Sequence, residues 1–129
     1  DLGDDVAGVE FHSVLQSNFN PIDGSLIQTI AEALMYVKDN KFKGLVLSSD
    51  AMHFSAGANL NLILNAAENK DWDSIDNLTS NMQKILQAVR FCEFPVIAAP
   101  FGMVLGGGYE VVGACDKVVA AAELYCGLV

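Results

Sequence analysis

Two runs of consecutive apolar residues constrain the fold of this chain more than any other feature. The segments Gly44–Ser48 and Val96–Ala99 contain no charged residue, and Pro95 ends any helix before the second of them. A strand with one face in water alternates apolar and polar residues, whereas a continuous apolar run is typical of a strand buried on both faces. We therefore expect an α/β protein built around a parallel sheet.

Helical patterns separate these strands along the chain. Apolar residues recur at helical spacing after the turn at residues 20–25, where Asp23 or Ser25 is a suitable N-cap. The further predicted helices are Asn59–Ala67, Trp72–Phe91 and Glu110–Cys115, and the further predicted strands are Val6–Phe11, Lys117–Ala120 and Leu124–Cys126. Alternating strands and helices favour parallel pairing with right-handed crossovers, and because no stretch resembles a linker we expect residues 1–129 to form one unit.

The composition argues against several classes of function. A formal net charge of −9, from 7 basic and 16 acidic residues, argues against a nucleic-acid surface. Although 52% of the residues are hydrophobic, no apolar stretch approaches the ~20 residues that span a bilayer, so we expect no membrane partner. The 3 cysteines form no CxxC pair, which favours reduced, buried thiols and a cytoplasmic protein. Residues 1–5 lack the features of a signal peptide, and we expect the chain to begin inside a larger protein.

Two glycine-rich turns follow predicted strands, at the end of the sheet where α/β proteins usually bind ligands. One is His53–Leu60, and the other is Leu105–Glu110, in which a run of glycines precedes a carboxylate. Such turns expose backbone N–H groups, so together they supply two converging donors beside a group that transfers protons. We expect Glu110 to be functional and to be held partly out of water.

Other catalytic patterns lack support in the sequence. The third glycine of a dinucleotide-binding motif would fall at Val111, and no Lys-Ser or Lys-Thr pair completes a phosphate loop. Ser55 has no G-x-S-x-G context, and with His12 and His53 as the chain's histidines a Ser-His-Asp arrangement lacks support. We expect structural roles for both histidines, and no metal because no cluster has metal-ligand spacing.

Taken in order, several segments resemble the crotonase superfamily, the enoyl-CoA hydratases and isomerases. These segments are Phe54–Leu60, Pro95–Ala99, Gly102–Glu110 and Ala114–Asp116. The GANL sequence at residues 57–60 and the opening Asp1–Ala7 are more similar to the hydratase region fused to a 3-hydroxyacyl-CoA dehydrogenase in bacterial fatty-acid oxidation proteins. The resemblance implies a crotonase-like (ClpP/crotonase) ββα superhelix, truncated in this chain.

The resemblance also implies a site and a substrate. By motif position, the backbone N–H groups of Ala58 and Gly107 form an oxyanion hole for the thioester oxygen of an acyl-CoA, and Glu110 matches the first of a hydratase's two catalytic glutamates. The implied substrate-binding positions are Ser55, Ala56, Gly57, Asn59, Leu60 and Gly106. The coenzyme A thioester is then a substrate and no cofactor is covalently bound. The implied partners are further copies of the chain, as in a trimer, or a fused dehydrogenase domain.

Two departures from the family pattern leave alternatives open. Asn59 stands where the family most often has Asp, and the family's second glutamate would directly follow Val129, so we expect this sequence to be the first half of a crotonase domain. The leading interpretation is an enzyme that adds water to a trans-2-enoyl-CoA in fatty-acid β-oxidation. The alternatives are an acyl-CoA isomerase or thioester hydrolase on the same scaffold, and a catalytically silent folding or interaction module.

Overall fold

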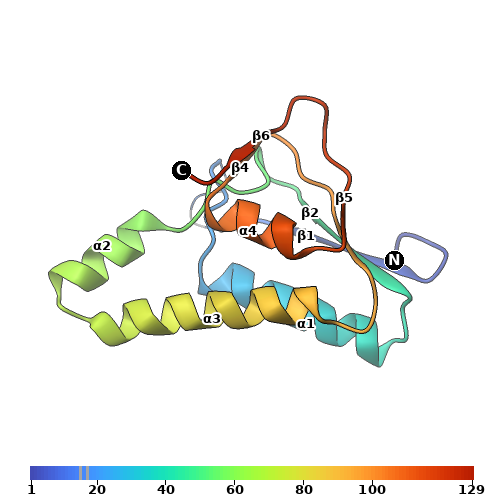
Figure 1. Ribbon diagram of the computed structural model, residues 1–129, viewed down its shortest axis with the longest axis horizontal. Helices are drawn as coiled ribbons and strands as arrows, with labels where there is room; N and C mark the ends of the chain where they lie inside the picture. Colours follow the sequence, from blue (N-terminus) through green and yellow to red (C-terminus); the bar gives the residue numbers. More distant parts are fainter. Residues whose placement is uncertain (15, 17) are drawn as a thin grey trace.

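The computed structural model describes residues 1–14, 16 and 18–129. Strands and helices are interspersed along the chain, as the sequence predicts (Figure 1). The elements in order are β1 (Val6–Phe11), α1 (Gly24–Asp39), β2 (Gly44–Ser49), α2 (Leu60–Glu68), α3 (Trp72–Arg90), β3 (Val96–Ala98), β4 (Met103–Leu105), α4 (Gly107–Ala114), β5 (Lys117–Val118) and β6 (Tyr125–Gly127).

A parallel sheet lies at the centre of the molecule, which confirms the predicted α/β class. Its strand order is β1-β2-β3-β5, and Leu45 of β2 pairs with Ala7 on one side and Val96 on the other, both in parallel register. β2 is therefore an inner strand, and its Leu45 and Leu47 side chains are 2% and 0% exposed. This position explains why β2 is an unbroken apolar run.

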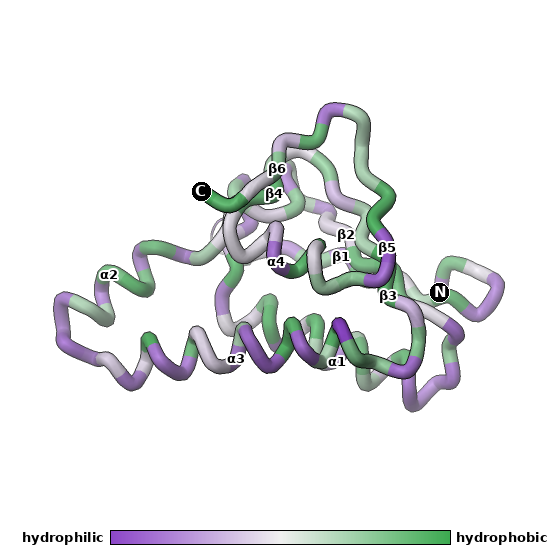
Figure 2. The backbone as a smooth tube through the Cα atoms, viewed as in Figure 1, coloured by the Kyte–Doolittle hydropathy of each residue, from purple (hydrophilic) through white to green (hydrophobic). Residues whose placement is uncertain are grey.

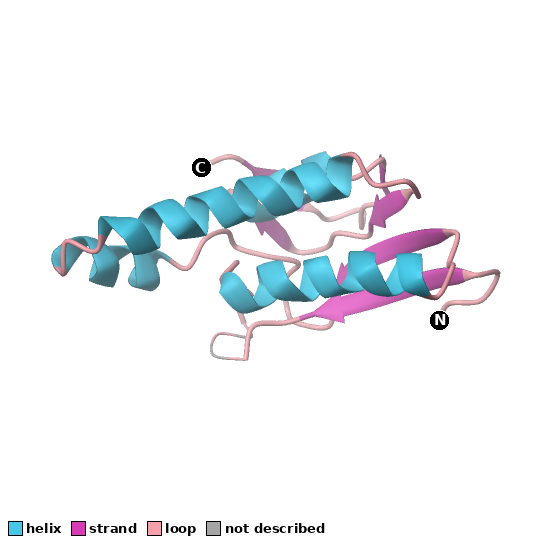
Figure 3. Cartoon of the chain, turned by 90° about the horizontal axis from the view of Figure 1, so that it is seen from below, coloured by secondary structure: helices cyan, strands magenta, loops and turns pink. Residues whose placement is uncertain are grey.

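Helices α1 and α3 lie side by side next to the strands (Figures 1 and 3). Their buried residues join the core of the sheet: Leu26, Ile30 and Val37 from α1, and Ile85 and Val89 from α3. Burial of one such side chain contributes about 1.5–3 kcal/mol. Along α3 hydrophilic and hydrophobic residues alternate with the turns of the helix, as expected for an amphipathic helix (Figure 2).

Both long helices begin at an aspartate that caps them. The Asp23 carboxylate accepts hydrogen bonds from the N–H groups of Ser25 and Leu26 at 3.0 and 3.1 Å, so Asp23 rather than Ser25 is the N-cap of α1. The Asp71 carboxylate accepts from the Ser74 N–H at 3.1 Å and from its hydroxyl at 2.6 Å. These two hydrogen bonds, the hydroxyl one first, lower the pKa of Asp71.

The structure differs from the sequence predictions at several element boundaries. Strand β4 was not predicted, because Met103–Leu105 is too short to show a periodicity between its flanking glycines. Helix α4 begins at Gly107 rather than Glu110, since Gly106 adopts φ 50° and ψ −121° and turns the chain directly into the helix. β5 ends at Val118, before the predicted Ala120, and β6 lies at Tyr125–Gly127 rather than Leu124–Cys126.

The α2–α3 hairpin extends away from the sheet, on the left in Figure 1. No residue of α2 is buried, and Leu60, Leu62 and Leu64 are 73%, 49% and 56% exposed. Within the described residues, none of the helices is long and apolar enough to cross a membrane. The prediction that all cysteines are buried is wrong for Cys126, which is exposed on β6.

Candidate active site

The carboxyl ends of the parallel strands bring the two glycine-rich turns together. The segment after β2 pairs with β4, because the Ser55 N–H donates to the Met103 carbonyl at 3.1 Å and the Leu105 N–H donates to the Ser55 carbonyl at 2.9 Å. β4 then leads directly into Gly106 and α4. The two turns are therefore held in a fixed register by backbone hydrogen bonds.

At the centre of this arrangement the backbones of Gly57 and Gly106 touch. A Cβ atom on Gly57 would lie 3.1 Å from the Leu105 carbonyl oxygen, and one on Gly106 would lie 3.8 Å from the Gly57 Cα. Gly57 has φ 97° and Gly106 has φ 50°, a conformation in which side chains are strained. Ala58 follows Gly57 and Gly107 follows Gly106. Because the two turns meet at these glycines, Ala58 and Gly107 lie close to one another.

The Ala58 amide points away from the chain segment that holds it. The Ile22 N–H donates to the Gly57 carbonyl at 2.7 Å, and the Asn59 N–H donates to the Ile22 carbonyl at 3.2 Å. The Gly57 carbonyl and the Ala58 N–H belong to the same peptide group and point in opposite directions. Because the carbonyl points toward Ile22, the Ala58 N–H faces away from Ile22. Among the hydrogen bonds of the described residues, the Ala58 N–H donates to no protein acceptor.

The Gly107 amide is also available, for a different reason. Gly107 is the first residue of α4, and the first N–H groups of a helix have no acceptor within it. The aligned peptide dipoles add a partial positive charge at this end of the helix. A developing negative charge between Ala58 and Gly107 would therefore meet two N–H donors and the favourable end of a helix dipole.

A cavity of about 220 Å³, which we call the Glu110 cavity, lies next to these amides. Its lining brings together Ala58, Gly107 and Glu110, the residues that the sequence assigns to catalysis. The rest of the lining is mostly apolar and comes from three helices and the loop before α1: Ile22, Ile27, Ile63, Leu78, Thr79, Met82, Gln83 and Leu86. The cavity thus combines an apolar wall with a few polar groups, the usual composition of a small-molecule site.

The Glu110 carboxylate lies beside Gly107. A Cβ atom on Gly107 would be 3.8 Å from Glu110 Oε2, and the Glu110 N–H donates to the Gly106 carbonyl at 3.1 Å in the first turn of α4. Among the described residues, Glu110 is the one titratable side chain that lines the cavity. It is exposed, so the prediction that it is held partly out of water is wrong for this chain.

The predicted substrate-binding residues lie around the cavity but do not line it. Ser55 is 1% exposed, and its hydroxyl accepts a hydrogen bond from the Gly57 N–H at 3.2 Å. Asn59 is 6% exposed and stands at the N-cap of α2, and Leu60 is directed to solvent. Ala56 donates its N–H to the Phe19 carbonyl at 2.8 Å. These residues, together with Gly57 and Gly106, shape the turns that carry the two amides.

Both histidines make structural contacts, as predicted. The Nδ1 atom of His53 accepts the Met103 N–H at 3.3 Å, at the start of β4. His12 and Asp50 form an exposed pair with 2.8 Å between Nδ1 and Oδ1. Across the described residues, no group of His, Cys, Asp and Glu side chains is arranged to hold a metal ion.

Sequence reasoning missed most of the cavity wall. Leu78, Met82 and Leu86 belong to the same apolar stripe of α3 as Ile85 and Val89, and such a stripe by itself indicates packing against a core. In the structure Ile85 and Val89 are buried, and Met82 and Leu86 are half-buried and packed against the core, but these two and the half-buried Leu78 also line the cavity. A second hollow of about 390 Å³ between α2 and α3 has Asp71 as its one titratable lining residue, and that carboxylate caps α3.

The chain belongs to the Enoyl-CoA hydratase/isomerase family, which residues 4–128 match. Solved structures confirm the crotonase fold. The enoyl-CoA hydratase from Thermoplasma volcanium superposes with a TM-score of 0.83 at 22% identity, over 99% of this chain and 49% of that one. The enoyl-CoA hydratase from Bacillus anthracis gives a TM-score of 0.76 at 26% identity, over 88% of this chain and 43% of that one.

Curated relatives include proteins of fatty-acid oxidation. A Bacillus subtilis protein named "Probable 3-hydroxyacyl-CoA dehydrogenase" is 40% identical over 100% of this chain, which spans 16% of its length. The human mitochondrial methylglutaconyl-CoA hydratase is 30% identical over 85% of the chain and 32% of its own length. A Rickettsia prowazekii protein is named "Putative fatty acid oxidation complex trifunctional enzyme". It is 28% identical over 90% of this chain, and the match again covers 16% of that protein's length. The chain therefore spans about a sixth of the longer relatives and about half of the solved structures.

Proposed function

We propose that this chain carries the thioester-binding part of an enoyl-CoA hydratase site that acts in fatty-acid β-oxidation. The observation that supports the proposal is the Glu110 cavity, where the Ala58 and Gly107 amides and the Glu110 carboxylate border one apolar space of about 220 Å³. Sites for whole drug-sized ligands are typically about 300–1,000 Å³. The smaller volume suits the reacting end of an acyl-CoA, with the nucleotide part of coenzyme A outside.

In the proposed reaction, water adds across the double bond that is conjugated with the thioester carbonyl. The water oxygen bonds to the β-carbon, and the electron pair of the double bond moves onto the thioester oxygen to form an enolate. The Ala58 and Gly107 N–H groups donate to that oxyanion, where removal of a single donor typically costs about 10²–10³-fold in rate. Glu110 takes the proton of the attacking water, and a carboxyl group returns a proton to the α-carbon.

Isomerisation of an enoyl-CoA is the second candidate, and a specific observation favours it. Glu110 is the one carboxylate that lines the cavity among the described residues, and moving a double bond needs a single carboxylate to carry a proton from one carbon to another. The oxyanion hole serves both reactions, because each passes through an enolate of the thioester. A thioester hydrolase and a catalytically silent module are the remaining interpretations.

The test uses the natural protein that contains this chain. Hydration is followed by the loss of enoyl-thioester absorbance with crotonyl-CoA, isomerisation by the gain of that absorbance with a 3-enoyl-CoA, and hydrolysis by the release of coenzyme A thiol. The hydratase proposal requires the first signal to be the fastest. Absence of all three signals would leave the silent module as the interpretation. The cytoplasmic location and the homo-oligomer or fused dehydrogenase domain stay predictions.

A further inference from the structure

We propose that Asn20 is a positioning residue that holds the Ala58 amide in place. This inference rests on the proposed function, since it concerns the oxyanion hole of that reaction. Asn20 lies outside the Glu110 cavity and is 0% exposed. Its backbone has φ 47°, a left-handed conformation that asparagine tolerates better than most residues.

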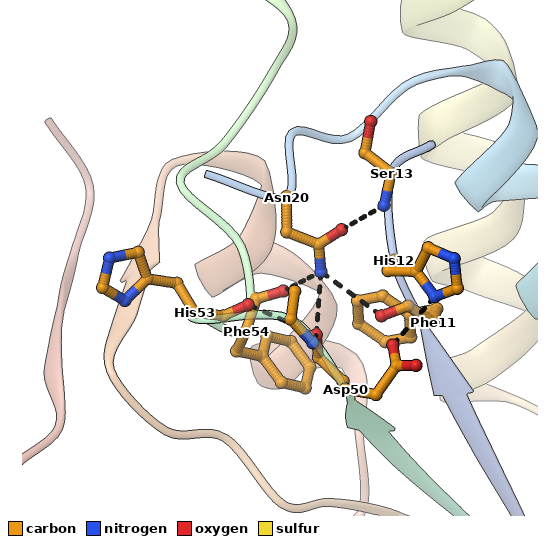
Figure 4. Close-up of polar contacts among 9 residues, drawn as sticks. Phe11, His12, Ser13, Asn20, Asp50, His53 and Phe54 are labelled. Atoms are coloured by element: carbon orange, nitrogen blue, oxygen red, sulfur yellow. Dashed lines mark hydrogen bonds and ion pairs between the residues drawn. The ribbon is translucent and has the colours of Figure 1, made fainter. Parts of the chain in front are cut away.

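The Asn20 side chain connects segments that are far apart in the sequence (Figure 4). Its Oδ1 accepts the Ser13 N–H at 2.6 Å, just beyond the end of β1. Its Nδ2 donates to the Phe54 carbonyl at 2.8 Å and to the Ser49 Oγ at 3.0 Å, and the Phe11 carbonyl lies 3.4 Å away. One buried amide therefore ties the carboxyl ends of β1 and β2 to the start of the turn that carries Ala58.

Backbone hydrogen bonds carry this anchoring forward to Ala58. On either side of Asn20, the Phe19 carbonyl accepts the Ala56 N–H at 2.8 Å, and Ile22 exchanges two bonds with the residues that flank Ala58. The segment 19–22 thus pairs with the segment 54–59, and Asn20 fixes the pair to the sheet. Since Ile22 holds the peptide groups before and after Ala58, it also sets the direction of the Ala58 N–H.

Replacement of Asn20 should therefore loosen the Ala58 amide without touching the substrate. Loss of the side chain leaves the buried Phe54 carbonyl and the Ser13 N–H without this partner, so the turn shifts relative to Gly107. Misplacement by about 1 Å away from the chemistry can cost roughly 10²-fold in rate. The expected loss is in kcat rather than in KM, because the apolar walls of the cavity come from other residues.

The experiment uses Asn20→Gly in the natural protein that contains this chain, because glycine keeps the left-handed backbone and removes only the side chain. Two quantities are measured: kcat and KM with crotonyl-CoA, and the absorbance shift of bound cinnamoyl-CoA, whose band moves to longer wavelength when its carbonyl is polarised. We expect kcat to fall about 10–100-fold with KM changed less than about threefold, and the shift to shrink.

Val37→Ala is the matched control, because Val37 is 0% exposed in the last turn of α1 and lies outside the Glu110 cavity. It lowers stability without loosening the turn, so the absorbance shift should stay at the wild-type value. If Asn20→Gly has the same absorbance shift and the same kcat as the wild type, the positioning role is overturned and the proposed function still stands. The absence of any shift or turnover in the wild type would overturn the proposed function itself.

Ser49→Ala decides the question if Asn20→Gly does not fold. This variant removes one acceptor of the same Asn20 amide, together with the Ser49 hydroxyl's bonds to the Ala51 N–H and the His53 carbonyl, and keeps the Asn20 bonds to Phe54 and Ser13. We expect kcat to fall about threefold at unchanged KM, with a smaller absorbance shift, since one of several anchoring bonds is lost. Wild-type kcat together with a wild-type shift would overturn the inference.

Discussion

Ser55 and Gly108 are packed so closely that no side chain fits between them. A Cβ atom on Gly108 would lie 2.7 Å from the Ser55 Cβ and 2.9 Å from the Ser55 carbonyl oxygen. Ser55 is paired with β4 through both its N–H and its carbonyl, so its backbone cannot move aside easily. This contact joins α4, which carries Gly107 and Glu110, to the turn that carries Ala58.

We therefore expect Gly108→Ala to destabilise the fold by about 1–3 kcal/mol, the usual cost of forcing an extra methyl group into a packed site. The free energy of unfolding is measured by urea titration of the chain, followed by circular dichroism. Gly113→Ala is the matched control, because it makes the same change in the same helix where a Cβ meets nothing within 4 Å. Alanine there should stabilise by about 0.5–1 kcal/mol. Equal effects of the two variants would contradict the packing argument.

Gly107→Ala separates the fold from the site. A Cβ at Gly107 makes ordinary contacts, 3.4 Å from Ile22 Cδ1 and 3.5 Å from Met82 Cε, so stability should change by less than about 0.5 kcal/mol. The methyl group nevertheless enters the Glu110 cavity beside the carboxylate. We expect binding of a non-reactive acyl-CoA analogue, measured by calorimetry on the natural protein, to weaken about tenfold or more. Unchanged affinity would mean that the acyl group binds elsewhere.

Glu110→Gln tests the role of the carboxylate. The amide keeps the shape of the side chain but cannot accept the water proton, and loss of general acid–base catalysis typically lowers kcat about 10²–10⁴-fold. KM for crotonyl-CoA should change only a few-fold, because the apolar walls and both amides remain. Glu93→Gln, an exposed glutamate that does not line the Glu110 cavity, should have wild-type kcat. Equal turnover of the two variants would remove Glu110 from the mechanism.

The sequence predicts the sheet and the two turns because both depend on local patterns. Unbroken apolar runs indicate buried parallel strands, and glycines with positive φ values, such as Gly57 and Gly106, are found where the backbone must turn tightly. Family resemblance adds predicted roles for Ala58, Gly107 and Glu110, and in the structure these three residues line one cavity.

The remaining features depend on contacts that no local pattern contains. Met82 and Ile85 belong to one apolar stripe of α3, yet Ile85 is buried in the core whereas Met82 packs against the core and also lines the Glu110 cavity. Asn20 lies in a turn sequence that would suit a surface loop, and only the meeting of β1, β2 and residue 54 makes it a buried anchor. The exposure of Glu110 likewise depends on what covers α4.

The buried thiol of Cys115 predicts a loss of stability at alkaline pH. Burial, helped by the negative charge of Asp116, raises the pKa of Cys115 from 9.0 to about 12. Between these two values the folded chain keeps the proton that the unfolded chain has released, so unfolding releases a proton and the free energy of unfolding falls as pH rises. Below about pH 9 both states carry the proton, and Cys115 adds no pH dependence.

Urea titrations from neutral pH to above pH 9 measure this slope, and Cys115→Ala should make it shallower. Some slope should remain, because burial also raises the pKa of Cys92. Cys126→Ala is the control, since Cys126 is exposed and its replacement should leave the slope unchanged.

In the native chain a thiol-specific reagent should label Cys126 at once, whereas Cys115, 6% exposed and donating to the Val111 carbonyl at 3.3 Å, should react only on unfolding. Rapid native labelling of Cys115, or an undiminished slope in Cys115→Ala, would show that this thiol is not shielded by the hydrophobic core.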